Sequence, residues 1–204
     1  MCSSDLFSGI HFVTGSHGPT RVMSTGGLRF WRDGRDVPDV MMGLYDYPST
    51  ASLPAFNLSL KVNFADGGGE SSMFRFVGTD GSLVIDGNRV IVARKAKARE
   101  PGYTISTFPK ATQAEFLKEY RAKYPEHEPE MTSSQDETHS APSGYSDEQH
   151  HLRNFIAAVR TRKPVVEDAT FGFRAAGPAL LTNLSYFENK PYLWDPEAMQ
   201  IVKG

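Results

Sequence analysis

The chain has 204 residues, of which 39% are hydrophobic and 23% charged, and its formal net charge is −2. These values are ordinary for a globular protein, and they argue against the strongly basic surface that typifies nucleic-acid or anionic-membrane binding. No apolar run approaches the roughly 20 residues that a membrane-spanning helix needs. The single cysteine, Cys2, excludes an internal disulfide and a cysteine-based zinc site.

The first half of the chain predicts strands joined by tight turns. In "AFNLSLKVNF" the apolar residues alternate strictly with polar ones; the apolar set is Phe56, Leu58, Leu60, Val62 and Phe64. Alternate side chains of a strand point to opposite faces, so one face should cover a core and the other should face solvent, substrate or a partner. Further strands are predicted at 20–31, 39–48, 71–78, 81–87 and 89–95.

The second half predicts helices. Residues 110–124 carry an apolar stripe, and residues 146–162 combine a capping box at Ser146 with a second stripe. Asp168 should cap a last helix, which Pro178 should kink or split because proline lacks an N–H group.

Two further segments of the second half carry no helical pattern. Between the first two helices, residues from about 125 to 145 are rich in Pro, Glu, Ser and Thr, and they predict a flexible excursion. After the last helix, the tail predicts an extended segment with a turn at Asp195-Pro196.

Strands followed by helices predict an α+β fold, with an open, mainly antiparallel β-sheet and helices packed on one face. Alternating βαβ units are absent from the pattern, which argues against a doubly wound parallel sheet. We expect residues 7–204 to form a single domain.

The histidines and glycines do not predict a metal or phosphate site. His150 and His151 are adjacent, so on a helix they diverge by about 100° and do not readily face one ion. The glycine-rich "DGGGE" lies between two predicted strands, where a hairpin is a better interpretation than phosphate binding. We therefore predict no metal and no cofactor-binding residues in this chain.

The densest polar cluster is "FWRDGRDVPD". Its candidate substrate-binding residues are Trp31, Arg32, Asp33, Arg35 and Asp36. One interpretation is a solvated hairpin loop that turns at Asp33-Gly34. The other is a grip on a sugar-like ligand, because carboxylates and guanidinium groups bind hydroxyls and an aromatic face stacks on a sugar ring.

Two more candidates lie outside that cluster. Lys61 belongs to the polar face of the strand at 55–64, which is either solvated, a dimer surface or the floor of a cleft. His11 sits beside Phe12 in an apolar setting, where a histidine is either packed or catalytic.

Several long segments resemble the C-terminal domain of the Gfo/Idh/MocA oxidoreductases. They are "GPTRVMSTGGLRFWRDGRDVPDVMMGLYDYP", "FRFVGTDGSLVIDG", "HLRNFIAAVRTRKPVVEDATFGFRAAGPALLTNLSYFENK" and "WDPEAM". The resemblance runs from Phe7 to Val202. It implies that a full-length parent has an N-terminal Rossmann domain that binds NAD or NADP, while this domain supplies the substrate wall and an oligomer sheet.

The resemblance also implies where catalytic residues lie. The family's catalytic lysine belongs to a Glu-Lys-Pro motif of the Rossmann domain, which this chain lacks, and Arg162-Lys163-Pro164 is not in the corresponding place. The family's histidine would precede Phe7, so its role is not transferred to His11. Met1 to Leu6, including Cys2, resemble the translation of a sequencing-library adapter, and we interpret them as a non-native scar.

These observations predict the C-terminal part of an NAD(P)-dependent oxidoreductase that acts on a sugar, cyclitol or related polyol. The chain alone should lack activity and should form a homo-oligomer through its sheet. Two alternatives remain open: a non-catalytic carbohydrate-binding or dimerisation module, and part of an NAD-dependent glycoside-cleaving enzyme. The sequence does not distinguish a cytoplasmic from a periplasmic location.

Overall fold

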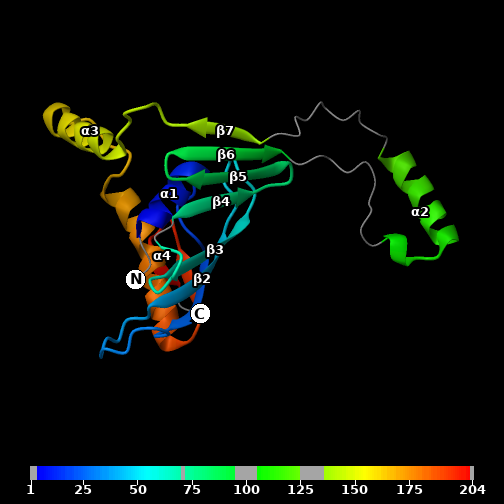
Figure 1. Cartoon of the computed structure of the whole chain (residues 1–204), viewed down its shortest axis with the longest axis horizontal. Coiled ribbons are helices and arrows are strands. Elements are labelled where there is room, and N and C mark those ends of the chain that lie inside the picture. Colours follow the sequence, from blue (N-terminus) through cyan, green and yellow to red (C-terminus); the bar gives the residue numbers. More distant parts are fainter. Residues whose placement is uncertain (1–3, 70–71, 95–104, 125–135, 203–204) are drawn as a thin grey trace. The chain divides into compact units, whose positions relative to one another are not determined.

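The computed structural model describes residues 4–69, 72–94, 105–124 and 136–202 (Figure 1). Its helices are α1 (Ser4–Thr14), α2 (Lys110–Lys123), α3 (Asp147–Thr161) and α4 (Ala169–Glu188), with a 3-10 turn, η1, at Ile105–Thr107. Its strands are β1 (Arg21–Gly27), β2 (Val40–Tyr47), β3 (Phe56–Asn63), β4 (Met73–Val77), β5 (Gly81–Asp86), β6 (Arg89–Arg94), β7 (Glu137–Ser140), β8 (Tyr192–Asp195) and β9 (Gln200–Val202). The predicted α+β class and the antiparallel pairing are confirmed.

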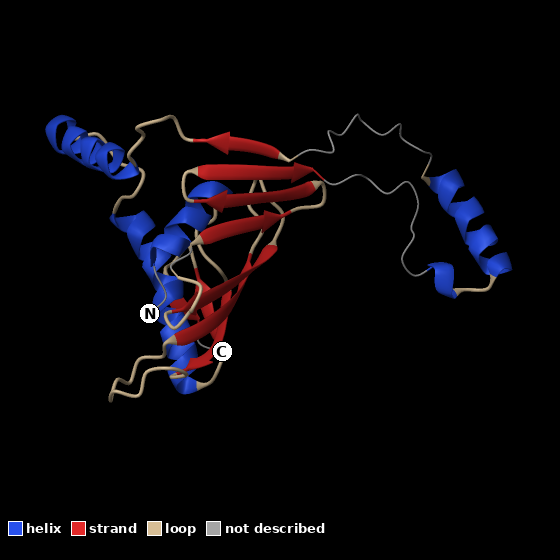
Figure 2. Ribbon diagram, in the orientation of Figure 1, coloured by secondary structure: helices blue, strands red, loops and turns tan. Residues whose placement is uncertain are grey.

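The described chain divides into two compact units, each with its own sheet (Figure 2). Unit 1 holds the described residues up to Gly69 and those from Asp147 onward, with strand order β3-β2-β1-β8-β9. Unit 2 lies between them in the sequence and has strand order β4-β5-β6-β7. The described strands therefore form two sheets rather than one, and the hairpin β8–β9 joins the first of them by pairing with β1.

The core of unit 1 lies between one face of its sheet and the helices α1 and α4 (Figure 2). Along β2 the side chains alternate: Met41, Tyr45 and Tyr47 are buried, whereas Met42 and Leu44 are exposed. The buried hydrophobic side chains of this core are Phe7, Ile10, Val22, Met41, Tyr45, Tyr47, Ala175, Ala179, Leu181 and Trp194. Period-two alternation therefore places one set of β2 side chains in the core, as the sequence predicts for such strands.

Tyr45 ties the sheet to helix α4. Its hydroxyl lies 2.7 Å from Thr182 Oγ1, and Thr182 in turn donates to the carbonyl of Pro178 at 2.7 Å. A Cβ atom at Gly43 would lie only 2.2 Å from the Tyr45 hydroxyl, so the ring occupies the space that glycine leaves free. The ring of Tyr45 also meets Phe7 of α1 edge-on at 5.0 Å between centroids.

Helix α4 begins and ends at conventional caps. Asp168 accepts a hydrogen bond from the Phe171 N–H at 2.8 Å, which confirms it as the N-cap, and Asn189 ends the helix in the left-handed region with φ 52°. The predicted split at Pro178 is wrong, because the helix runs unbroken from 169 to 188. Proline removes a single backbone bond, and the buried face around Pro178 and Leu181 stabilises the helix on both sides of it.

Unit 2 is built around a meander. The register places Phe74, Phe76, Leu83, Ile85, Val90 and Val92 on one face of its sheet. Of the predicted excursion at 125–145, residues 125–135 lie outside the described residues. Strand β7, within the described remainder, pairs with β6, so this part of the excursion is regular structure.

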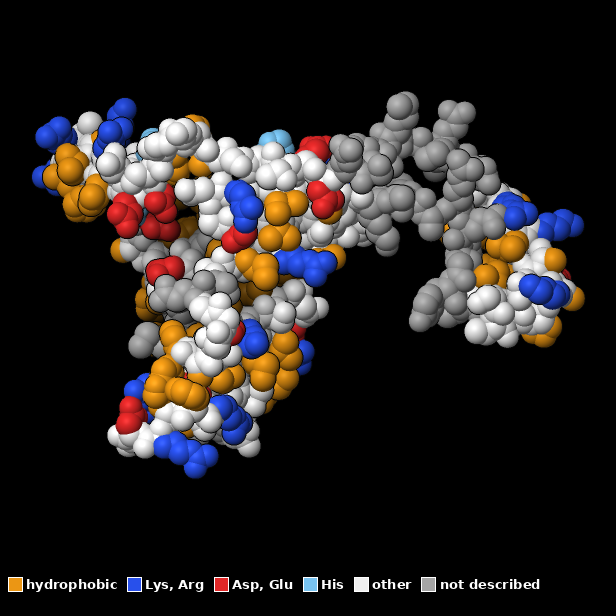
Figure 3. All heavy atoms as spheres, viewed as in Figure 1, with side chains coloured by type: hydrophobic (Ala, Val, Ile, Leu, Met, Phe, Trp, Pro, Cys, Tyr) orange, Lys and Arg blue, Asp and Glu red, His pale blue; other side chains and the backbone are white. Residues whose placement is uncertain are grey.

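Helix α3 confirms the predicted helix after Ser146 but buries none of its residues. Its apolar stripe is exposed: Leu152 57%, Phe155 60%, Ile156 46% and Val159 50%. In Figure 3 these hydrophobic side chains gather on one side of the helix at the upper left. Among the described residues, no helix has the length and apolar character to cross a membrane.

At the chain start, helix α1 already includes Ser4–Leu6, although the sequence shows no helical pattern before Phe7. Residues 1–3 lie outside the described residues. The interpretation of the first six residues as a scar stays a prediction.

Candidate functional site

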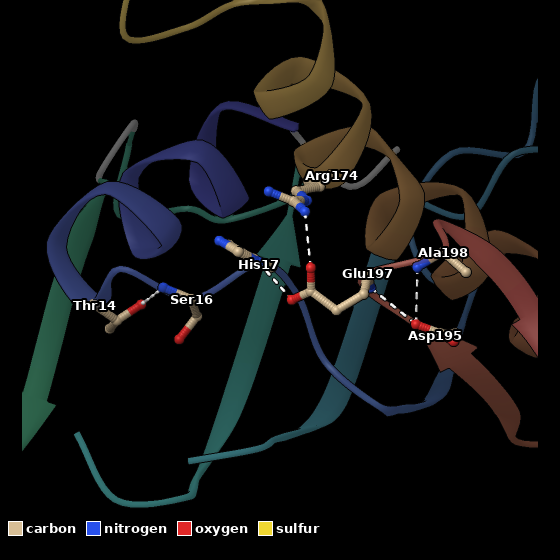
Figure 4. A network of polar contacts seen from close by, with 7 residues as sticks. All are labelled: Thr14, Ser16, His17, Arg174, Asp195, Glu197 and Ala198. Atoms are coloured by element: carbon tan, nitrogen blue, oxygen red, sulfur yellow. Dashed lines mark hydrogen bonds and ion pairs between the residues drawn. The ribbon is translucent and has the colours of Figure 1, made fainter. Parts of the chain in front are cut away.

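A polar cluster in unit 1 joins three elements through one carboxylate (Figure 4). Glu197, in the β8–β9 turn, lies 2.5 Å from His17 Nδ1 through one oxygen, and its other oxygen accepts from Arg174 of α4 at 3.1 Å. The turn itself is fixed by Asp195, whose Oδ1 accepts from the backbone N–H groups of Glu197 and Ala198, each at 2.9 Å. An Asx-type turn thus aims Glu197 at the side chains of both His17 and Arg174.

The end of helix α1 positions His17. The Gly15 N–H donates to the His11 carbonyl at 2.8 Å with φ 66°, a left-handed conformation that favours glycine. Thr14 Oγ1 donates to the Ile10 carbonyl at 2.7 Å and accepts from the Ser16 N–H at 3.3 Å. The chain therefore leaves the helix in a defined direction, and His17 reaches the β8–β9 turn (Figure 4).

His11 lies buried in the same unit and is uncharged at neutral pH. Burial, with smaller electrostatic contributions from nearby His17 and Arg174, lowers the pKa of His11 to about 4. Its Nε2 lies 3.0 Å from the Tyr47 hydroxyl. Burial also raises the pKa of Tyr47, so the phenol keeps its proton. The pair is therefore neutral, and His11 is a packed histidine.

Four buried side-chain atoms of unit 1 have no hydrogen-bond partner within the described ranges: His11 Nδ1, Ser16 Oγ, Arg174 Nε and Trp194 Nε1. Leaving a buried polar group unpaired costs about 1–3 kcal/mol. All four belong to α1, α4 or the loops and strand that meet them. Hydrogen-bond partners supplied to this region would therefore relieve part of that cost.

The loop between β1 and β2, which we call the arm (residues 28–39), contains five of the predicted site residues. It brings three of them together: the Arg35 guanidinium lies 4.5 Å from the centroid of the Trp31 ring and donates to Asp33 at 2.8 and 2.5 Å. The hydrogen bond from Arg35 lowers the pKa of Asp33 to about 2. Arg32 and Asp36 belong to the same arm and are exposed.

Asp39, the last residue of the polar cluster "FWRDGRDVPD", organises the arm, a role that the sequence alone does not indicate. Its side chain is 2% exposed and accepts backbone N–H groups of Arg29, Phe30 and Trp31 at 2.7, 2.8 and 3.0 Å. Burial by itself would raise the pKa of Asp39, but the three N–H donors together hold it below its ordinary value. The only signal in the sequence is an acidic residue between Pro38 and the following strand. That signal does not predict which backbone N–H groups the carboxylate accepts.

The second face of the unit 1 sheet, which we call the open face, is apolar in its middle and polar at one end. Its exposed apolar side chains are Met23, Met42, Leu44, Leu193 and Val202, each between 44% and 55% exposed. At one end Asp46 accepts from Arg21 and Asn57, both at 2.6 Å, across three neighbouring strands. Lys61 lies on this face opposite Met42.

The predicted site residues consequently fall in three places rather than one. His11 is in the core beside the polar cluster, Lys61 is on the open face, and the other five are on the arm. The sequence did not predict the polar cluster of His17, Arg174 and Glu197, because 180 positions separate the first residue from the last.

In unit 2, a shallow concavity of about 300 Å³ lies at one end of the sheet. Phe76, Leu83 and Val92 form its apolar floor, and Asp80, Ser82 and Arg94 contribute polar groups. Arg94 is already paired with Glu137 at 3.3 Å. The concavity is open, and its polar groups include no buried side chain within the described part of the unit.

Solved structures share this fold. An aldose-aldose oxidoreductase from Caulobacter crescentus, complexed with glycerol, matches 93% of this chain with a TM-score of 0.57 at 13% identity. An NAD-binding protein from Listeria innocua matches 93% with a TM-score of 0.54 at 11% identity. An oxidoreductase from Agrobacterium radiobacter, in complex with NAD+, L-tartaric acid and magnesium, matches 97% with a TM-score of 0.53 at 12% identity.

The matches cover 45%, 49% and 48% of those three chains, so this chain spans about half the length of the proteins that it resembles. The chain has the fold of the C-terminal domain of Gfo/Idh/MocA-type oxidoreductases. At 11–13% identity these likenesses establish the fold alone. No protein-family model matches the chain, and no curated protein matches it significantly.

The described residues include no glycine-rich turn of the kind that holds a nicotinamide dinucleotide in a Rossmann fold. Such a cofactor needs a glycine-rich turn that leads from a strand into the N-terminus of a helix. Here Gly67, Gly68 and Gly69 lie between strands β3 and β4 instead. No step of a reaction is therefore assigned to a cofactor held by these residues.

Proposed function

We propose that the chain is the substrate-side, C-terminal part of an NAD(P)-dependent oxidoreductase that acts on a small hydroxylated molecule. One observation carries the proposal: more than nine-tenths of the chain matches just under half of an oxidoreductase chain of the same fold. In the proposed parent, the nicotinamide is held by a separate domain and supplies the hydride chemistry. This chain contributes binding surface and orientation.

The proposed substrate class is a sugar, cyclitol or related polyol. Two of the similar structures were solved with glycerol and with L-tartaric acid, which are both small and hydroxyl-rich. In this chain, the exposed Glu197 carboxylate and the Arg174 guanidinium can accept from and donate to such hydroxyls. Neutral, buried His11 and Tyr47 would support this wall rather than exchange protons with the substrate.

The upstream DNA gives the first test. We expect it to encode a glycine-rich strand–helix unit followed by a Glu-Lys-Pro motif. An intact upstream gene without that unit would overturn the oxidoreductase proposal. For the chain as it stands, titration with NAD and NADP should show no binding, and micromolar affinity would contradict the proposed division of labour.

The full-length protein gives the second test. Screening sugars, cyclitols and polyols with NAD and NADP, while following absorbance of the reduced nicotinamide, should find a substrate. Arg174→Gln should then raise KM or lower kcat, whereas Arg153→Gln on the exposed surface of α3 serves as the matched control. Equal effects of the two substitutions would remove the polar cluster from the substrate wall. A parallel screen with glycosides, which follows release of the free sugar without net reduction of the nicotinamide, distinguishes the alternative parent, an NAD-dependent glycoside-cleaving enzyme.

The open face favours a second role, which is pairing of two copies. Five side chains that are about half exposed form its apolar middle, and a polar row closes one end, as in many homodimer interfaces. Leu44→Glu should place a charge in that middle and shift the chain toward monomer, while Arg153→Glu should not. Sedimentation velocity that shows wild type and Leu44→Glu with the same association would contradict pairing through this face.

A further inference from the structure

We propose that the arm is a second self-association surface, in which the arms of two copies dock on one another about a two-fold axis. This inference is independent of the oxidoreductase proposal and of pairing through the open face. The arm extends from the β1–β2 hairpin at the lower left of Figure 1. The occupant to which we commit is a second copy of this chain.

The arm is preorganised. Buried Asp39 holds the backbone of residues 29–31 through three N–H groups. On the outer side, Arg35 covers the ring of Trp31, and Phe30 meets that ring edge-on at 5.5 Å between centroids. The loop therefore has a defined shape before any partner arrives, and little conformational entropy remains to be lost on binding.

The surface of the arm exposes apolar and aromatic side chains beside its charged ones. Phe30 is 65% exposed, Val37 45% and Leu28 40%. Exposed aromatic residues beside arginine are the composition of interface hot spots, whereas a merely solvated loop has no reason to be held rigid around them.

The charges of the arm complement one another across a two-fold axis. The arm carries three arginines and three aspartates, so its net charge is zero. Arg35 pairs with Asp33, Asp39 is satisfied by backbone, and Arg29 donates to the Gly26 carbonyl at 2.9 Å. Within the described ranges, Arg32 and Asp36 have no ion-pair partner.

In a two-fold contact, Arg32 of one copy meets Asp36 of the other, and the reciprocal pair forms by symmetry. Figure 3 shows basic and acidic side chains next to hydrophobic ones at the lower-left tip, where the arm ends. A partner with one dominant charge would gain nothing from this alternation, but a second copy would gain two ion pairs.

The expected contact is weak. Twelve residues from each copy are fewer than the roughly 20–30 residues a side of a standard interface, so the arm contact belongs to the transient class. It should be studied in the Leu44→Glu chain, because that substitution removes pairing through the open face and leaves the arm intact. Sedimentation equilibrium across a wide range of concentrations then measures the arm contact alone.

A charge swap tests the proposal. In the Leu44→Glu chain, Arg32→Glu should weaken association about tenfold, because two ion pairs become two repulsions. Adding Asp36→Arg to Arg32→Glu should restore association, since the swapped arm is again complementary to itself. Phe30→Ser should weaken association without changing the charge, and Arg153→Glu on α3 is the control that should not.

Several outcomes would overturn the proposal. One is a Leu44→Glu chain that stays monomeric at every concentration. Another is Arg32→Glu with the same dimer as its parent. A third is a double variant that is no better than Arg32→Glu alone. Quenching of Trp31 fluorescence by glucose in a strictly monomeric chain would assign the arm to a sugar instead, and none of these results would bear on the oxidoreductase proposal.

Discussion

The two faces of strand β2 differ in their surroundings far more than in their composition. Tyr45 on one face is 1% exposed, and its neighbour Leu44 on the other face is 55% exposed. The first packs against Phe7 of α1 and hydrogen-bonds to Thr182 of α4, whereas the second faces away from both helices. The contrast shows that hydrophobic alternation fixes which residues share a face, while other segments decide which face becomes the core.

The strongest test of this contrast compares neighbouring residues. Tyr45→Ala should lower the free energy of unfolding by about 3–5 kcal/mol, because it opens a cavity and removes one of the two hydrogen bonds of the Thr182 hydroxyl. Leu44→Ala should cost less than about 1 kcal/mol in the monomer. Urea denaturation at low protein concentration measures both. Similar losses for the two variants would mean that the open face is also part of a core.

The dependence of stability on acid pH tests the burial of His11, which packs beside Tyr47 on the buried face of β2. Its folded pKa of about 4 lies below the ordinary value of 6.5, so the unfolded chain binds a proton that the folded chain excludes. This contribution is complete above pH 6.5, is lost as the pH falls toward 4, and amounts to about 3 kcal/mol over that window. His11→Gln should flatten this part of the curve, and an unchanged slope would refute the buried neutral state.

Gly43 lies on the buried face of β2, where its lack of a side chain leaves room for the ring of Tyr45. Gly43→Ala should cost about 1–3 kcal/mol, because a methyl group there collides with the buried ring of Tyr45. Thermal denaturation measures the loss. Combining Gly43→Ala with Tyr45→Phe, which withdraws the hydroxyl that the methyl group meets, should recover part of it; full additivity of the two losses would argue against the collision.

The smallest effect is expected at the polar end of the open face. Arg21→Gln removes an ion pair with Asp46 that is largely solvent-exposed, and it should change the free energy of unfolding by less than about 0.5 kcal/mol. A loss above 1 kcal/mol in urea denaturation would show that this row is covered in solution.

Local chemistry predicted most of the secondary structure. The alternation at 56–64 gave β3, and Asp168 capped α4 where the carboxylate could satisfy an orphan N–H. Pro178 misled the prediction, because a local rule assigns a cost to proline but does not include the tertiary packing of Ala175, Ala179 and Leu181 that offsets it. The division of strands between two sheets also depends on long-range pairing, such as that of β1 with β8.

The candidate site was predictable only where it is local. The pairing of Asp33 with Arg35 follows from their spacing in one tight loop. Glu197 reaches His17 only after α4 and the final hairpin have folded onto the sheet, and no pattern within either segment indicates the partner. The alternation of β3 predicted that Lys61 is exposed. It did not predict that Lys61 lies opposite Met42, because the register between β3 and β2 is set by long-range pairing.

The pairing of β1 with β8 has a consequence for biosynthesis. Unit 1 is interrupted in the sequence by all of unit 2, and Trp194, which fills part of its core, belongs to β8, which is made after unit 2. Unit 2 is contiguous, so its meander can pair while the ribosome is still translating α4. The first three strands must then wait, with Val22 and Tyr45 only partly covered, until the closing hairpin emerges. The segment that carries β1, β2 and β3 should therefore depend on chaperones longer than unit 2 does.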